Sequence, residues 1–446
     1  MRRTSSTATA AAVALLLAAC AGGDEQGGED GSGGTSTAVP APAPAPEDEG
    51  SQDEEDAADA ADDEAADDED DAPQGVSPPA TSLDEADDGE AGGPLEVTIA
   101  AAGDILAHSR LNLTANAYAG GAAGAYDYTP MFEDVSSPIS EADLALCHLE
   151  TPLSPDNTNL SVPDTLVFNT PREMADALAG AGFDGCDFAS NHTMDMGVSG
   201  LAATEQVVRD AGMGYAGPTA DEDRSGLAEV YEVEAEGGPA RIAHLAYTYT
   251  YPNSGTPTTD VPGEAPWLVD ASWPNLGSEG ILEQASAARQ EGADFVVVSM
   301  HWGNEYQAQP TEDQTRIARD LLGSGDVDLV LGTHVHVIQP CEEVDGRHVI
   351  YGLGNFLSNQ SPDTNANLLP ATQEGMVATF TLTRDEEGGI SSRMDYQPTR
   401  VEIVPGPQPG PHVIRLVSPE TYPETWERTT ATVDLLGGCG AEPLEP

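Results

Sequence analysis

The sequence contains no lysine: all 16 of its basic residues are arginines, and they stand against 78 aspartates and glutamates. The formal net charge is −62 at pH 7. Proteins that bind nucleic acid need a basic surface for its phosphates, so this balance excludes nucleic acid as a partner. A chain of this composition fits a salty or extracellular setting.

Several catalytic motifs are also missing. No C-x-x-C occurs, which argues against a cysteine zinc site and against a thioredoxin-like redox centre. The sequence has no glycine-rich phosphate loop and no G-x-S-x-G turn. These absences argue against nucleotide-dependent enzymes and serine hydrolases.

The apolar run near the N-terminus, residues 11–19, is too short to cross a membrane as a permanent helix. Arg2 and Arg3 precede it, and Leu-Ala-Ala leads to Cys20. This order predicts an export signal over residues 1–20, with Cys20 as the lipidated residue of a bacterial lipoprotein. The alternative is an ordinary secretory signal in which the cysteine has no such role. We expect the protein at the extracellular face of the cell membrane, held there by its lipid.

Residues 21–94 contain no basic residue and 25 of the 78 acidic ones. Such a segment cannot bury enough apolar surface to fold, and its like charges repel one another. We therefore predict a disordered, Pro/Ala/Gly-rich linker that holds a folded domain away from the membrane. We place that domain at residues 95–404 and a Pro/Gly-rich tail, packed on it, at 405–446. Together these two parts carry 14 arginines against 53 acidic residues, a formal charge of −39.

Four cysteines remain after the predicted lipidation site: Cys147, Cys186, Cys341 and Cys439. Outside the cytoplasm they would form two disulfides, with three possible connectivities. Cys341 with Cys439 would join the tail to the domain, and Cys147 with Cys186 would link neighbouring strands. The sequence does not choose among the three.

Apolar strands alternate with helical patterns through most of the domain, which is typical of the α/β class. Short apolar runs such as residues 296–298 and 329–331 predict strands buried on both faces. After Glu374 the pattern turns to strands only, so we expect a mixed or second sheet.

Chemistry-bearing residues gather where the predicted strands end. Six of the nine histidines do so: His108, His148, His192, His301, His334 and His336. Asp104, Glu150 and Asn191 occupy equivalent positions. The carboxyl ends of strands are where open α/β sheets bind their ligands. His334 and His336 alternate, and in an extended segment they would face the same side.

A mixture of carboxylate, amide oxygen and imidazole suits Mn, Fe or Zn and does not suit calcium, which prefers oxygen ligands alone. Two such ions close together would activate a water and clamp a phosphoryl or similar tetrahedral centre. We therefore expect divalent metal ions, two in number, at this edge of the sheet.

Seven short motifs occur in one order between about residues 95 and 360: G-D-I-L-A-H, H-L-E-T-P, F-N-T-P, A-S-N-H-T-M-D-M-G, H-W-G-N-E-Y, G-T-H-V-H-V-I-Q and G-N-F-L-S-N-Q. This set resembles the bacterial capsule-synthesis CapA family, which is associated with poly-γ-glutamate capsule biosynthesis. The resemblance implies an α/β (α+β) fold of the calcineurin-like metallophosphatase kind, a sandwich of two mixed β-sheets flanked by helices.

The same resemblance implies roles for individual residues. The implied metal ligands are Asp104, Glu150, Asn191, His301, His334 and His336. His192 would stand beside the metals as the proton donor or the contact to the substrate oxyanion, with Asn191 as its catalytic neighbour.

Two motifs depart from the general pattern, so the sequence does not decide whether further residues bind the metals. The first motif has its histidine, His108, four residues after the aspartate where metallophosphatases have it two after. His148 stands where the family more often has asparagine, and Glu150 stands where phosphatases usually have aspartate. His108 and His148 are therefore candidates for additional ligands.

These observations predict a membrane-anchored enzyme, a metal-dependent hydrolase or transferase acting on an anionic envelope polymer such as poly-γ-glutamate. One alternative is a non-catalytic accessory protein that binds or exports the polymer beside other capsule-synthesis membrane proteins. Another is a metallophosphoesterase of a different substrate. The domain and tail, with a combined charge of −39, are a poor binder of a polyanion unless cations bridge the two.

Overall fold

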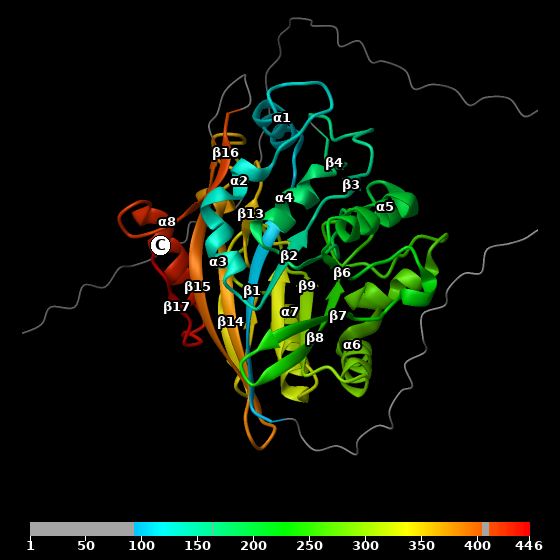
Figure 1. The fold of residues 1–446 in the computed structure, drawn as a ribbon, viewed down its shortest axis with the longest axis vertical. Helices are drawn as coiled ribbons and strands as arrows, with labels where there is room; N and C mark the ends of the chain where they lie inside the picture. Colours follow the sequence, from blue (N-terminus) through cyan, green and yellow to red (C-terminus); the bar gives the residue numbers. More distant parts are fainter. Residues whose placement is uncertain (1–92, 164, 404–409) are drawn as a thin grey trace, which may run out of the picture. The chain divides into compact units, whose positions relative to one another are not determined.

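The computed structural model describes residues 93–163, 165–403 and 410–446 (Figure 1). The predicted signal segment, Cys20 and the acidic segment up to residue 92 lie outside these residues, so their predictions stay predictions. In the described part of the chain, no helix has both the length and the apolarity needed to cross a bilayer.

The larger of two mixed β-sheets has the strand order β16-β15-β14-β1-β2-β5-β6, with β13 beside the end of β1 and β17 beside β15. Neighbouring strands from β1 to β6 are parallel, whereas β14, β15 and β16 are antiparallel. The bounds are β1 Leu95–Ile105, β2 Leu144–Leu149, β5 Gly185–Asp187, β6 Gly214–Ala216, β13 Asn355–Leu357, β14 Glu374–Arg384, β15 Ile390–Ile403, β16 His412–Leu416 and β17 Glu442–Pro443.

The smaller sheet has the order β11-β12-β10-β9-β8-β7, and its four central strands are parallel. Its bounds are β7 Glu229–Ala235, β8 Gly238–Tyr247, β9 Phe295–His301, β10 Leu329–Thr333, β11 Cys341–Val344 and β12 Arg347–Ile350. A separate pair, β3 Leu153–Ser154 and β4 Thr170–Pro171, lies in the connection after β2.

Helices cover the outer face of each sheet. Residues of α1 to α5 share one buried apolar cluster with the larger sheet, and residues of α6 and α7 share another with the smaller sheet. The bounds are α1 Ser109–Tyr118, α2 Thr129–Phe132, α3 Ser136–Ser140, α4 Glu173–Ala181, α5 Gly197–Asp210, α6 Trp273–Gln290, α7 Glu312–Ser324 and α8 Pro423–Val433. The predicted sandwich of two mixed sheets flanked by helices is confirmed.

A third apolar cluster fills the layer between the two sheets, and strand alternation decides which side chains reach it. In β2, Leu144 and Leu146 belong to this inter-sheet layer, whereas Ala145 and Cys147 face the helices. In β9, Phe295 and Val297 likewise point between the sheets. Continuing the alternation to the strand ends places His148 and His301 at the carboxyl-end edge of the inter-sheet layer.

Strands β1 and β2 run further than their sequence predicts. Their local apolarity predicts that the first ends at Ala102 and the second at Cys147, but both continue because Asp104 pairs with His148. Ile105 also pairs with Leu357 of β13. Pairing with a distant segment therefore extends the strands into the candidate site, and local apolarity could not reveal that.

The C-terminal part contributes regular structure to the domain. We expected a tail from residue 405, but β16 continues the larger sheet as the neighbour of β15. Helix α8 packs against β15, and Cys341 is bonded to Cys439 across a Cα–Cα distance of 5.8 Å. The second disulfide joins Cys147 to Cys186, so the structure selects one of the three pairings that the sequence left open.

Candidate metal centre

The six predicted ligands come together at the carboxyl ends of β1, β2, β5, β9 and β10 and in the loops that follow them. Every one of these side chains is buried: Asp104, Glu150, Asn191, His301, His334 and His336. They form a connected set, since each lies within hydrogen-bond, ion-pair or ring-contact distance of another member. Their role as ligands stays a prediction, but the convergence that the role requires is present.

Asp104 is placed by the glycine before it. A Cβ on Gly103 would lie 2.0 Å from the carbonyl oxygen of Gly354, so only glycine allows the two backbones to approach there. The Asp104 amide then donates to that same carbonyl at 2.9 Å. One carboxylate oxygen accepts from the backbone amide of His334 at 3.1 Å, and the other lies 3.0 Å from Nδ1 of His336.

The segment carrying His334 and His336 is bent, and our expectation of an extended segment was wrong. Both residues have positive φ, 87° and 57°, in a region that residues other than glycine seldom adopt. The bend is held by the bond from the His334 amide to Asp104 and by Asn355, whose side chain contacts both Nδ1 and the carbonyl of His336. Both rings still face the cluster, with centroids 6.0 Å apart. Strained backbone of this kind collects at functional sites.

Glu150 lies one residue beyond β2 and has no exposed surface. It forms an ion pair with His336, whose Nε2 lies 3.6 Å from one carboxylate oxygen. Burial raises the pKa of Glu150 to about 7, against the opposing effect of His336. Burial lowers the pKa of His336, but Glu150 and the hydrogen bond to Asp104 outweigh it and raise that pKa to about 10. Without a metal ion, the cluster therefore holds a proton on this imidazole near neutral pH.

His301 and Asn191 meet across the two sheets. Nε2 of His301 lies 2.9 Å from the side-chain oxygen of Asn191, and Nδ1 lies 3.1 Å from the Thr333 hydroxyl. The Asn191 amide donates to Asn253, which orients its oxygen toward His301. Burial, together with the other histidines nearby, lowers the pKa of His301 well below its usual value, so this ring is neutral and able to coordinate.

His192 lies beside the cluster and belongs to none of the potential ligand groups in the described part of the chain. Its Nδ1 lies 2.9 Å from Asp195, which also accepts from the backbone amide of Phe168. The Phe168 ring packs edge-on against the imidazole at 4.6 Å. Because the carboxylate can only accept, Nδ1 carries the hydrogen and Nε2 is left for a substrate. This arrangement fits the predicted proton donor, a role that stays a prediction.

The structure separates the two histidines that the sequence left open. His148 offers a ligand atom within 4.8 Å of those of Asp104 and His301. His108 is in no such group among residues 93–163, 165–403 and 410–446; its Nδ1 lies 3.1 Å from the Leu106 carbonyl and its ring packs against Phe168. Of the two, His148 is the one placed to bind a metal.

Several residues near the cluster were not singled out from the sequence. Asp187 and Asp195 orient His148 and His192 through their Nδ1 atoms. Glu305 is exposed and has a carboxylate oxygen within 4.8 Å of ligand atoms of His334 and His336. The motif H-W-G-N-E-Y contains Glu305, so its position was visible, but nothing local distinguishes it from a surface glutamate.

The residues present fit a divalent metal ion. Three groups of potential ligand atoms overlap here: Asp104, His148 and His301; Asp104, Glu150 and His336; and Glu305, His334 and His336. Four buried side-chain atoms at this place also have no hydrogen-bond partner within the described residues: Nε2 of His148, both carboxylate oxygens of Glu150 and Nδ1 of His334. Buried polar atoms are normally paired, so this concentration indicates that something outside the protein chain completes them.

Comparison with known proteins agrees with the motif resemblance. Residues 98–360 match the family described as bacterial capsule synthesis protein PGA_cap. The capsule biosynthesis protein CapA of Bacillus anthracis is 27% identical over 59% of this chain and 60% of its own length. The PGA biosynthesis protein CapA of Bacillus subtilis is 28% identical over 52% of this chain and 57% of its own length.

The match therefore spans somewhat over half the length of these relatives. Among solved structures, the calcineurin-like phosphoesterase YfkN of Bacillus subtilis overlaps loosely, with a TM-score of 0.40 and 14% identity over 76% of this chain and 99% of that one. The family match covers more than half of the sequence and contains all six predicted ligands and His192. The chain belongs to the bacterial capsule synthesis (PGA_cap) family, the family of the CapA proteins.

Proposed function

We propose that this protein is a metal-dependent hydrolase or transferase that acts on an anionic envelope polymer of the poly-γ-glutamate kind. In this proposal Cys20 carries a lipid, residues 21–94 form a tether, and the domain works at the extracellular face of the membrane beside other capsule-synthesis membrane proteins. The family membership supports a role in capsule biosynthesis. The chemistry is inferred from the cluster.

The observation that carries the proposal is the set of unpartnered buried atoms. Glu150 has both carboxylate oxygens buried without a hydrogen bond to any described residue, and His148 and His334 each have such a nitrogen. Leaving a buried polar atom unpaired costs about 1–3 kcal/mol. In a purely structural cluster, these atoms would form hydrogen bonds within the protein. In a metal site, they remain free to coordinate the ion.

The ligands divide naturally between the two sheets. Asp104, His148, Glu150 and Asn191 come from the larger sheet and its loops, and His301, His334 and His336 come from the smaller sheet. We propose two ions, of Mn, Fe or Zn, because the donors are mixed oxygen and nitrogen and form overlapping groups. Ions bound there would polarise a substrate oxygen and lower the pKa of water.

His192 supplies the proton chemistry in this proposal. Asp195 holds its Nδ1–H, so in the doubly protonated ring Nε2–H is the group that gives a proton to the leaving atom when the scissile bond breaks, and Nε2 regains a proton from the water that attacks. The water that attacks loses one proton and the leaving atom gains one, so hydrolysis consumes no other reactant. Phe168 limits the motion of the ring.

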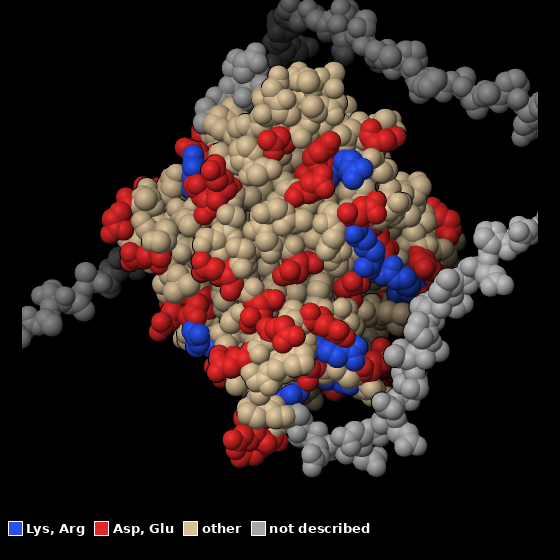
Figure 2. All heavy atoms as spheres, viewed as in Figure 1, with Lys and Arg blue, Asp and Glu red and all other residues tan. Residues whose placement is uncertain are grey.

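The surface charge supports an enzyme over a general polymer binder. Figure 2 shows a face on which acidic side chains outnumber basic ones, with several arginines directly beside acidic groups. Arg209, Arg319 and Arg415, for example, each form an ion pair with a glutamate. Such arginines offer little attraction to a polyanion, so we propose that the positive charge that a polyanion needs comes from the bound ions at one point.

Elemental analysis combined with activity assays tests the proposal. We expect the purified protein to contain tightly held Mn, Fe or Zn and to cleave poly-γ-glutamate or a generic phosphodiester. His334→Ala should lose metal and activity together. His348→Ala is a matched control, since His348 is also buried but has both ring nitrogens hydrogen-bonded far from the cluster. A wild-type protein that takes up no divalent metal, even from supplemented buffer, would contradict the proposal.

The location is tested separately. Replacing Cys20 with Ser should move the protein from the membrane fraction to the soluble fraction if the cysteine is lipidated. A Cys20→Ser variant that stays in the membrane fraction would show that another segment anchors the chain.

A further inference from the structure

We infer that His148 is a metal ligand and that the Cys147–Cys186 disulfide, one residue before it, sets its position together with Asp187. This inference rests on the proposed metal site and assigns a residue that the sequence left undecided. It concerns two neighbouring residue pairs across strands β2 and β5, one covalent and one hydrogen-bonded.

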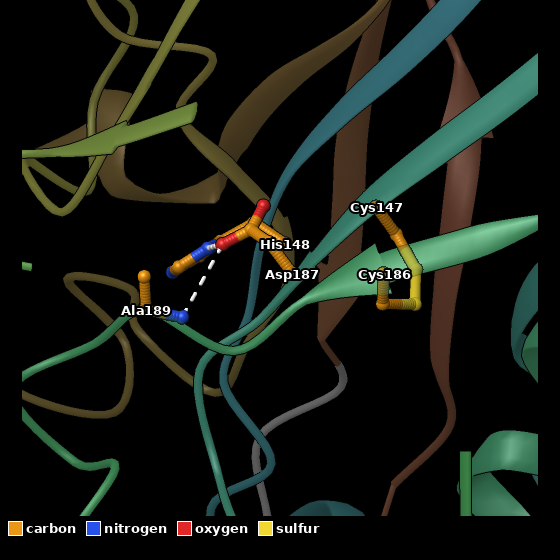
Figure 3. Close-up of a disulfide and its surroundings, with 5 residues drawn as sticks. All are labelled: Cys147, His148, Cys186, Asp187 and Ala189. Carbon is orange, nitrogen blue, oxygen red and sulfur yellow. Dashed lines mark hydrogen bonds and ion pairs between the residues drawn. A yellow bond between two sulfur atoms is a disulfide. The ribbon is translucent and has the colours of Figure 1, made fainter. Parts of the chain in front are cut away.

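The two pairs are consecutive in the ladder. Cys147 is opposite Cys186, and His148 is opposite Asp187 (Figure 3). The disulfide spans a Cα–Cα distance of 4.5 Å. In the next pair, Nδ1 of His148 lies 2.7 Å from a carboxylate oxygen of Asp187. The disulfide therefore joins the residue pair directly before the pair that contains the candidate ligand.

The two pairs face opposite sides of the larger sheet. Cys147 and Cys186 belong to the apolar cluster beneath the helices, so the disulfide is out of contact with the metal site. His148 follows Leu144 and Leu146 on the inter-sheet face, and His301 reaches the same layer from β9. The two imidazoles stack there with centroids 4.8 Å apart. The disulfide consequently acts on the site only by fixing the backbone.

Asp187 determines which nitrogen of His148 is available. One of its carboxylate oxygens, Oδ1, accepts both from Nδ1 and from the backbone amide of Ala189, the latter at 3.4 Å. Nε2 is left without a partner in the part of the chain that the structure describes, although the residue is only 1% exposed. A carboxylate behind a histidine, with the other nitrogen directed at a metal, is a recurrent arrangement that orients the ring and increases its basicity.

The disulfide fixes the register of β5 against β2, which matters because β5 is short. Only three residue pairs join it to β2, and the strand runs directly into the loop that carries Asn191 and His192. A slip of one residue would turn Asp187 away from the site. A bond between Cys147 and Cys186 prevents that slip, and it also fixes the start of the loop.

Metal binding by variants tests the inference with a readout other than activity. The metal-free protein is titrated with Co²⁺, and affinity is measured by competition with a chelator while the visible spectrum reports the ligand set. We expect His148→Ala, which leaves no ligand atom at this position, to lower affinity by about a hundredfold and to change the spectrum. Asp187→Asn should lower affinity by about 10- to 100-fold, the range seen for partners behind a ligand. Cys147→Ala combined with Cys186→Ala should lower it by about tenfold.

The second disulfide provides the matched control. Cys341→Ala combined with Cys439→Ala removes a bond of the same kind that joins the smaller sheet to the C-terminal part, and it should leave Co²⁺ affinity and spectrum unchanged. Melting curves establish that each variant is folded. If the Cys147 and Cys186 variant does not fold, Asp187→Asn decides the positioning claim by itself.

The outcomes separate the two proposals. Wild-type affinity and an unchanged spectrum in His148→Ala would overturn the assignment of His148 while leaving the metal site in place. Unchanged affinity in the folded Cys147 and Cys186 variant would overturn the role of the disulfide. A wild-type protein that binds no Co²⁺ would overturn the proposed function itself.

Discussion

Strand β10 has a buried polar cluster at each end, and the two clusters differ in one respect. Before the strand, Asp328 is fully buried, yet its oxygens accept from the Val296 amide and pair with Arg289 and Arg347. After the strand, His334 and Glu150 both belong to the candidate metal cluster, and both have buried atoms with no hydrogen bond to any residue that the structure describes. The first cluster is complete within the protein and the second is not.

Whether the buried polar atoms are all paired within the protein distinguishes a structural polar cluster from a functional one. Both contain charged groups that folding removes from water at considerable cost. At Asp328 that cost is offset by partners from β9, β12 and α6. At the carboxyl end of β10, buried donors and acceptors remain unpaired within the protein. They lower the stability of the protein without a ligand, and they are available to bind one.

The largest effect on stability is expected at the Asp328 cluster, whose hydrogen bonds are complete within the protein. Asp328→Ala removes a fully buried carboxylate and leaves the partly buried Arg289 and Arg347 without their shared partner, so the free energy of unfolding should fall by about 3–5 kcal/mol. Denaturant unfolding measures the change. Metal content of the folded fraction should stay at the wild-type level, because Asp328 is no ligand; a loss of metal would show that the two clusters are coupled.

At the candidate metal cluster, loss of the proposed proton donor His192 should slow the reaction and leave metal binding intact. His192→Ala should reduce turnover by about a hundredfold, the size expected for a lost general acid, while metal content by elemental analysis stays unchanged. The imidazole belongs to none of the ligand groups described. Equal loss of metal and activity would instead make His192 a ligand.

Replacing Glu150 should have opposite effects on metal binding and on the stability of the metal-free protein. Burial raises the pKa of Glu150 to about 7, so its ionisation opposes folding as the pH rises from its unfolded value of about 4.5. Glu150→Gln removes that cost, and Asp104 still contacts His336. The metal-free variant should be more stable by about 1–2 kcal/mol at pH 8, whereas its metal affinity should fall. A destabilised metal-free variant would mean that Glu150 already has adequate partners.

A smaller, pH-dependent effect is expected at His412 in β16, outside both clusters. Burial and the charge of Arg110 lower its pKa to about 4, despite the carbonyl of Gly410. The neutral ring is held by Thr114 and Asn359. The unfolded state binds a proton near pH 6.5, so stability is lost as the pH falls from about 6.5 toward 4.

Between pH 6.5 and pH 5.5 this loss amounts to about 1 kcal/mol. His412→Gln should flatten the pH dependence of unfolding by that amount. An identical pH slope in the variant would show that other groups cause the loss.

Much of the candidate site follows from local sequence. Asp104, Glu150, Asn191, His301, His334 and His336 each follow a segment that the sequence predicts as a strand, and parallel strands bring such residues to one edge. The physical reason is that hydrophobic periodicity and strand breaks are properties of short segments. The α/β class, the family motifs and the acidic excess were readable for the same reason.

Tertiary structure decided the details that determine chemistry. His148 and His108 look equivalent in the sequence, and only the pairing of β2 with β5, which brings Asp187 to Nδ1, directs one of them into the cluster. His334 and His336 adopt positive φ because Asp104, more than 200 residues earlier, holds the bend. The choice of disulfides, likewise, depends on which strands become neighbours.

The sequence by itself thus determined which residue types stand at the strand ends and therefore which kind of ligand they suit. The tertiary structure decided which of them share a site, which nitrogen each ring presents, and which atoms remain unpaired. These properties depend on contacts between segments far apart in the chain, such as Asp104 with His336 and His301 with Asn191, and no local pattern records such contacts.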